Sequence, residues 1–349
     1  MAMGCVFCGE EPSTKTKEHV IPQWLLRRTG DPSRLANFGY DMKSKKIRNF
    51  PFNSFTFPAC DSCNSEYSVL EGDSEKALSK IMNGNEVKVE ELNILLDWFD
   101  KVRVGLWLGI RQLNANPAGV TPNFYIKNRI GLHDRMLAIE RVNKHPEGIN
   151  FIGTETLSFA LNPSVFCLRV NNFYFYSVSH MFLLAEGLGF PYPESSSLTK
   201  SKFTEVMLNP GDGVIKNRLV PFDLNVDGIK VYQPMLKSNS KQINLLSAGH
   251  VEKHFVDISL GIGNIFVETN NGLIETNYSD SILVTPNYID GLDGQLKKAN
   301  LNVLSVQDFY TDKALNEVSF EKLPEKERVD ARMFFEAAKI VNNDIRENL

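Results

Sequence analysis

The stretch CVFC at residues 5–8 and the stretch CDSCN at residues 60–64 decide the fold of the N-terminal part of this chain. Each contains two cysteines separated by two residues, a spacing that lets two sulfurs approach one ion from a single tight turn. Four thiolates from two such turns are the donor set of a tetrahedral structural zinc site. A redox pair would need a thioredoxin-like strand–helix setting, which neither pair has. The sequence therefore predicts zinc bound by Cys5, Cys8, Cys60 and Cys63, with four unconnected buried cysteines as the alternative.

The composition is that of a soluble globular protein. Of the 349 residues, 42% are apolar and 23% are charged, and the chain is long enough for two or three domains. The net charge of −4 argues against a protein that coats nucleic acid, although it allows a local basic site. No apolar run is long enough to span a membrane, and the N-terminus lacks an apolar signal core. We therefore expect a cytoplasmic protein without a membrane partner, whose cysteines are reduced.

Changes in composition and in apolar pattern along the chain predict an α+β protein with a small N-terminal head and a larger body. Residues 1–72 are rich in turn formers and basic residues and poor in apolar periodicity, so a metal would have to supply part of their stability. Residues 73–116 form a helical connector, and residues 117–349 form a mixed helix and sheet domain for recognition or regulation. On this division, replacing Cys5 or Cys8 is expected to unfold the head and leave the body intact.

Apolar periodicity predicts three helices. One covers residues 73–82 with Asp73 as its N-cap, and a longer one covers residues 89–113 and places Trp98 and Trp107 in the core. The third covers residues 323–348, with Pro324 at its first turn, and is expected to dock through an amphipathic face.

Between residues 117 and 310 the pattern favours strands. Runs of β-branched and aromatic residues at 164–179 and 228–236 predict strands, with Cys167 in the core. A hairpin is expected within residues 263–277, around Asn271–Gly272. A short helix is expected at residues 179–189, begun by a serine and ended by a glycine.

The segment between the two cysteine pairs carries the residues for chemistry. It contains KEHVIPQWL at residues 17–25, and Asn64 directly follows the last cysteine, at the start of an expected helix. Glu18 and Asn64 offer the oxygen ligands that Mg²⁺ prefers. His19, beside such an ion, could accept the proton of an attacking water. These residues together suggest a hydrolytic site with a single metal ion.

CVFC, EHVIP and CDSCN in this order resemble the HNH endonucleases, which have a ββα-metal fold, and specifically the subgroup held together by a four-cysteine zinc. The resemblance covers residues 5 to about 71. It implies two strands and a helix around the site, with His19 as general base and Glu18 and Asn64 as ligands of a catalytic Mg²⁺ or Mn²⁺. The four cysteines would hold the structural zinc.

The sequence departs from the common pattern of that family at three places. Glu18 stands where aspartate is usual, and no glycine pair follows the proline. The middle asparagine, which orients the histidine, is expected five residues before the third cysteine, where this chain has Phe55; we assign that role to Asn53. Some members carry a further glutamate, for which Glu71 is a candidate, although a solvated carboxylate at a helix end is the simpler interpretation.

A metal-activated hydroxide suits the hydrolysis of phosphodiesters, and the resemblance implies DNA, expected to be double-stranded, as the substrate. A function in bacterial restriction or anti-phage defence is suggested by analogy alone, and a regulatory protein or a second copy of the chain is a possible partner. The alternatives are a zinc-stapled DNA-binding or adaptor protein with a degenerate site, and a nuclease that cuts RNA. The basic residues expected to contact the phosphate backbone are Arg27, Arg28, Lys43, Lys45, Lys46 and Arg48.

Overall fold

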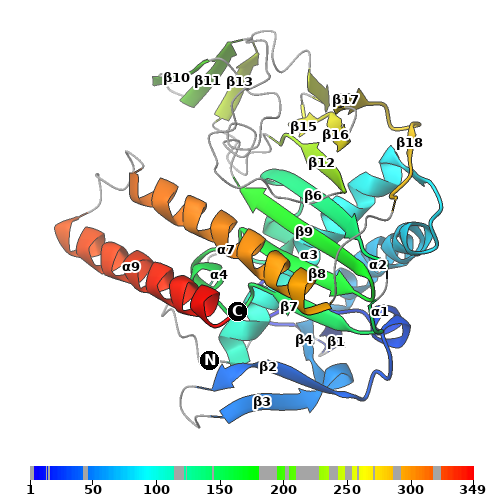
Figure 1. Cartoon of the computed structure of the whole chain (residues 1–349). Coiled ribbons are helices and arrows are strands. Elements are labelled where there is room, and N and C mark those ends of the chain that lie inside the picture. The colour runs from blue at the N-terminus through cyan, green and yellow to red at the C-terminus, as the bar shows by residue number, and fades with distance from the viewer. Residues whose placement is uncertain are drawn as a thin grey trace.

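A computed structural model gives the fold, which combines helices and sheets as the sequence predicts (Figure 1). The structure describes residues 4–12, 14, 16–41, 46–113, 122, 124–143, 145–180, 195–200, 204–209, 228–235, 243–247, 254–257, 259–269, 272–285, 292–316 and 324–349. Among these, the side chains of residues 38–41, 46–48, 112–113, 195–200, 204–209, 243–247, 269, 272 and 273 are not described.

The N-terminal part is built on two paired strands and a helix. Strand β1 (Thr16–His19) runs antiparallel to β4 (Thr56–Ala59), with Glu18 opposite Phe57. Cys60 then leads directly into helix α2 (Asp61–Met82), which contacts β1. This order of strand, strand and helix is the one that the sequence predicts. Between the two strands lie α1 (Gln23–Arg28), β2 (Leu35–Asp41), β3 (Lys46–Pro51) and the short 3-10 helix η1 (Phe52–Ser54).

The two long helices that follow the cysteines pack against each other. Helix α3 (Val89–Leu113) has the predicted bounds, and both of its tryptophans are buried as expected. The helix expected at 73–82 is instead the second half of α2, which continues without a break through Gly72 and Asp73. Asp73 is therefore not an N-cap, and residue 72, the expected end of the head, lies inside a helix. The short strand β5 (Val87–Lys88) precedes α3 and pairs with β18 (Ser281–Ile282).

The body is organised around a seven-stranded sheet in which every neighbouring pair is antiparallel. Its strand order is β17-β16-β12-β6-β9-β8-β7. The expected hairpin in residues 263–277 is present as β16 and β17. The bounds are β6 (Asp134–Arg141), β7 (Ile149–Ile152), β8 (Val165–Val170), β9 (Phe173–His180), β12 (Ile229–Gln233), β16 (Ile265–Thr269) and β17 (Gly272–Thr276).

Helices cover both faces of this sheet, which explains the continuous apolar runs of its central strands. Successive side chains of a strand point to opposite faces. Phe166 and Leu168 belong to the core that contains α3, whereas Cys167 packs toward α7 (Leu292–Asn316) on the other face (Figure 1). A strand covered on both sides needs apolar residues at every position. The predicted core position of Cys167 is confirmed.

Helix α7 was missed by the sequence patterns, which favour strands up to residue 310. Its buried face carries Ala299, Val303 and Val306 at helical spacing, but Gln295, Asn302 and Gln307 are buried beside them and weaken the apolar pattern. Part of this polar surface bonds to the sheet side: Lys298 Nζ lies 2.9 Å from a carboxylate oxygen of Glu140, and the amide of Gln307 donates to the carbonyl of Gly153.

The last helix, α9 (Glu325–Glu347), follows Pro324 as predicted and packs beside α7 and α4 (Leu157–Leu161). Its docking face is narrower than expected, because Val329, Met333 and Ile340 of the expected apolar set are exposed. The helix expected at 179–189 is wrong at its start, since residues 179–180 end strand β9; residues 181–189 lie outside the described part. The remaining elements are η2 (Ile126–Asn128), β10 (Ser195–Lys200), β11 (Thr204–Asn209), β13 (Ile243–Ser247), β14 (Phe255–Asp257) and β15 (Ile262–Gly263).

One apolar core joins the N-terminal part to the body. It runs from Cys5 and Phe7 through α2 and α3 to the strands of the large sheet. Phe7 stacks on Tyr67 of α2 with ring centroids 4.3 Å apart, and its carbonyl accepts a hydrogen bond from the amide of Lys127. Within the described residues, none of the helices combines the length and the apolarity needed to cross a bilayer.

Candidate metal centre and candidate active site

The four cysteines predicted to bind zinc lie together. All are free thiols, and their sulfur atoms lie within 4.8 Å of one another. The sulfurs of Cys8 and Cys60 are 3.8 Å apart. Zinc–sulfur bonds of about 2.3 Å in a tetrahedron separate the sulfurs by about 3.8 Å, so the cluster has the dimensions of a zinc site. The cysteines could therefore hold a metal ion, and zinc fits the donor set.

The electrostatics of the cluster also favour a cation. Burial raises the pKa of Cys60 to about 11 and that of Cys63 to about 12, and the neighbouring cysteine sulfurs add to both increases. Burial likewise raises the pKa of Cys5, but hydrogen bonds from the backbone amides of Cys60, Cys8 and Phe7 outweigh it and lower the pKa overall. The Cys60 amide donates to the Cys5 sulfur at 3.3 Å. A bound divalent cation would stabilise all four thiolates.

The cluster fixes the strands that carry the candidate catalytic residues. The amide of Val6 donates to the carbonyl of Pro58 on β4, so the first cysteine turn is bonded to the strand that leads into the second. Glu18 and His19 end strand β1, which pairs with β4. Asn64 lies in the first turn of α2, and its amide donates to the carbonyl of Cys60 at 2.9 Å. The side chain of Asn64 has no hydrogen-bond partner among the residues described.

His19 is oriented by the backbone of the segment assigned to the middle asparagine. Its Nε2 lies 3.1 Å from the carbonyl oxygen of Asn53 and 2.9 Å from the side-chain amide of Gln23. The side chain of Asn53 itself is exposed. The Asn53 carbonyl can only accept, so this contact requires a proton on Nε2 and leaves Nδ1 free to accept one, whereas the Gln23 amide nitrogen can only donate and requires the other tautomer. The contact thus depends on the main chain at residue 53 and would not require asparagine there.

Glu18 has a partner that the sequence reasoning missed. Its side chain is 8% exposed, and its carboxylate accepts a hydrogen bond of 2.6 Å from the ammonium group of Lys101, a fully buried residue of α3. The same ammonium group bonds to the carboxylate of Glu71 on α2. The signal was present in the sequence, because Lys101 interrupts one of the most apolar segments of the chain.

Glu71 belongs to this site and is not a solvated residue at a helix end. It lies within α2, with its side chain 21% exposed. Burial raises the pKa of Glu71, Lys101 opposes that increase, and the nearby carboxylate of Glu18 adds to it. His19 is also close enough for its charge to act on Glu71. Two carboxylates therefore share one ammonium group, and the cluster keeps an excess of negative charge.

The basic residues expected to contact DNA are only partly described. Arg27 and Arg28 lie in the last turn of α1, where Arg27 is exposed and Arg28 is half-buried against Met82. Lys43 and Lys45 lie outside the described residues. Lys46 and Arg48 belong to β3, and their side chains are not described either.

Comparison with models of protein families, with curated proteins and with solved structures found no match to this chain. The resemblance to HNH endonucleases therefore rests on the residues of the chain alone. The four-cysteine cluster is compatible with the zinc-stapled form of that fold.

Proposed function

We propose that this chain is a metal-dependent HNH endonuclease that hydrolyses DNA phosphodiester bonds in the cytoplasm, as part of a bacterial defence or restriction system. The main support is the arrangement of the N-terminal part. A strand that ends in Glu18 and His19 pairs with the strand that leads through Cys60 into α2, and Asn64 lies in the first turn of that helix. The free thiols agree with a reducing compartment.

In the proposed reaction, a water oxygen attacks phosphorus and the bond to the leaving oxygen breaks, which gives a phosphate monoester and an alcohol. His19 accepts the proton of the water at Nδ1, while the contact of Nε2 with the Asn53 carbonyl holds the ring. Glu18 and Asn64 would hold Mg²⁺ or Mn²⁺, which stabilises the negative charge that develops on the phosphate. The four cysteines would hold zinc away from this chemistry.

The second candidate is a zinc-stapled DNA-binding or adaptor protein without catalytic activity. The salt bridge between Lys101 and Glu18 supports it, because an ammonium group already occupies the carboxylate that would bind the catalytic metal. The excess of negative charge on Glu18 and Glu71 supports the nuclease instead, because it leaves one carboxylate charge for a further cation.

Cleavage of plasmid DNA with Mg²⁺ or Mn²⁺ distinguishes the two candidates. We expect His19→Ala to lose roughly a hundred- to ten-thousandfold in rate, the usual contribution of a general base. His145→Ala, which replaces a histidine of the body that bonds to Tyr174, should keep the wild-type rate. Equal cleavage by wild type and His19→Ala would exclude His19 as the base. A zinc-loaded protein that binds DNA but cuts neither DNA nor RNA with either metal would favour the adaptor.

A further inference from the structure

A polar cavity lies in the body, at the end of strand β9. Its volume is about 320 Å³, and α3, the segment before β6 and the end of β9 contribute to its walls. The lining is polar and carries basic groups. The side chains that line it are Arg103, Arg129, His133, Asn162, Ser179 and His180.

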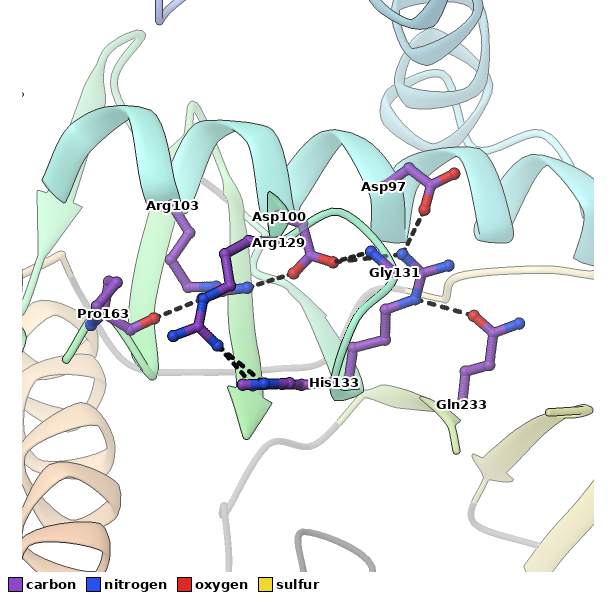
Figure 2. Close-up of polar contacts among 9 residues, drawn as sticks. Asp97, Asp100, Arg103, Arg129, Gly131, His133, Pro163 and Gln233 are labelled. Carbon is purple, nitrogen blue, oxygen red and sulfur yellow. Dashed lines mark hydrogen bonds and ion pairs between the residues drawn. The ribbon is translucent and has the colours of Figure 1, made fainter. Parts of the chain in front are cut away.

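The only carboxylate bonded to the arginines of this cavity, among the described residues, is shared with a third arginine. Asp100 forms a salt bridge with Arg103, and its other oxygen lies 3.4 Å from Arg135 and accepts the amide of Gly131 at 3.1 Å (Figure 2). Arg135 pairs in addition with Asp97. Both oxygens of the Asp100 carboxylate are therefore already bonded to groups other than Arg129.

Arg129 has only neutral partners in the described structure. Its Nη1 lies 3.0 Å from Nδ1 and 2.9 Å from Nε2 of His133 and donates to whichever of the two carries no proton (Figure 2). Its guanidinium carbon lies 3.8 Å from the centre of the Phe124 ring. Burial lowers the pKa of Arg129 to about 10, the positive charge of Arg103 lowers it further, and Asp100 opposes both. The group still carries its charge at neutral pH. Arg129 is half-buried, and a partly desolvated charge without a counter-ion is destabilising, so the arrangement suits an anion.

The histidines contribute uncharged hydrogen-bonding groups. Burial lowers the pKa of His133 to about 3 and that of His180 to about 4, and the charges of Arg129 and Arg103 add to both decreases. His180 stacks on Tyr310 with ring centroids 4.0 Å apart, which fixes its plane. Within the described residues, its Nδ1 is buried without a hydrogen-bond partner, and so is Nε of Arg103, a residue only 4% exposed.

We propose that this cavity binds a phosphate group, held between the guanidinium groups of Arg103 and Arg129 and contacted by the ring of His180. Guanidinium groups bind phosphate through charge-assisted hydrogen bonds. Arg103 pairs with Asp100 through one terminal nitrogen and donates to the carbonyl of Pro163 through the other, so its Nε is the group left for the ligand, and Arg129 supplies the uncompensated positive charge. The volume exceeds what phosphate alone needs and lies at the lower end of the range of ligand sites. The ligand is therefore a small molecule that carries the phosphate, or phosphate itself. The site is separate from the proposed nuclease centre.

The test is the thermal unfolding of the full chain with inorganic phosphate, with ribose 5-phosphate and with sodium acetate, each at matched ionic strength. We expect both phosphates to raise Tm and acetate to have no effect. Tighter binding of ribose 5-phosphate would identify an organic phosphate as the natural ligand, and equal binding would identify free phosphate. Absence of a phosphate effect, or an equal effect of acetate, would overturn the proposal.

Substitutions show which residues are responsible for the effect of phosphate on Tm. Arg129→Met should weaken phosphate binding roughly ten- to hundredfold, the contribution of charge-assisted hydrogen bonds. The control Arg332→Met replaces an exposed arginine of α9 and should bind as wild type does. If Arg129→Met fails to fold, His180→Phe keeps a ring on Tyr310 and should also weaken binding. A phosphate effect that survives in the cavity variants but disappears in Arg27→Gln would place the anion in the head and contradict the assignment.

Discussion

Helix α3 supplies buried cations to two regions of the molecule, and these regions have opposite charge balance. On the side of the head, Lys101 is one ammonium group between the carboxylates of Glu18 and Glu71. On the side of the body, Arg103 and Arg129 lie beside Asp100, which Arg135 shares. The first region has an excess of negative charge and suits a cation. The second has an excess of positive charge and suits an anion.

This difference teaches that burial alone does not reveal the purpose of a charged residue. Lys101 compensates the charges of two acids. Its removal would leave their carboxylates to repel each other without a counter-ion. Among the described residues no acid pairs with Arg129, so its removal would relieve an uncompensated charge. The balance of charge around each residue, and not its depth, predicts what a substitution does.

Loss of the cysteine cluster should have the largest effect, because it removes one side of the comparison altogether. We expect Cys63→Ser to lose zinc and to destabilise the fold by about 10 kcal/mol, the scale of structural zinc binding. Zinc analysis and circular dichroism would measure both. Cys167→Ser, which changes a buried cysteine outside the cluster, is the control for zinc content and should keep its metal.

The variant Cys63→Ser also tests whether the head folds independently of the body. The sequence predicts that the head unfolds alone, but Cys5 and Phe7 belong to the core that reaches the large sheet. We therefore expect a single transition that includes the body. Limited proteolysis of Cys63→Ser that left a stable fragment of the body would contradict this expectation.

Removal of the buried ammonium group should have the next largest effect. Lys101→Met leaves Glu18 and Glu71 without a counter-ion and should cost about 3–5 kcal/mol in the free energy of unfolding, measured with denaturant. Lys80→Met is the control, because its pair with Glu91 is partly exposed and should contribute about 1 kcal/mol or less.

The two sides of α3 should therefore differ in the sign of the change in stability that follows loss of the cation. Without phosphate, Arg129→Met should leave the stability unchanged or raise it by about 1 kcal/mol, since it removes an uncompensated, half-buried charge. Two equal losses, in Lys101→Met and Arg129→Met, would show that the charge balance described for the two regions is wrong.

Zinc binding should also depend on pH. Because the pKa values of Cys60 and Cys63 are raised to about 11 and about 12, both thiols keep their protons at neutral pH in the metal-free protein. Zinc must displace these protons, so its affinity should rise with pH, roughly tenfold per pH unit for each proton displaced. Competition with a chelator between pH 6.5 and 8.5 would measure it. A constant affinity would mean that the thiols are already ionised.

The sequence predicts local features of the fold well where one physical pattern governs the segment. The range 89–113 shows helical periodicity throughout and forms α3 with the expected bounds. Prediction from the sequence fails where a segment buries polar residues, as in α7, which places Gln295 and Gln307 in the interior. It also fails at Asp73, a plausible cap that packing against α3 leaves inside a continuous helix.

For the candidate sites, the sequence by itself determined the four cysteines, their spacing, and the position of Glu18, His19 and Asn64 relative to them. These follow from residue types that occur at fixed short distances along the chain. Only the tertiary structure decided that Lys101 reaches Glu18 across 83 positions, that the carbonyl of Asn53 contacts His19, and that Arg129 pairs with His133 and with no acid in the described part of the chain. The physical reason is that the charge balance of a buried group depends on every segment packed around it, and those segments are distant in sequence.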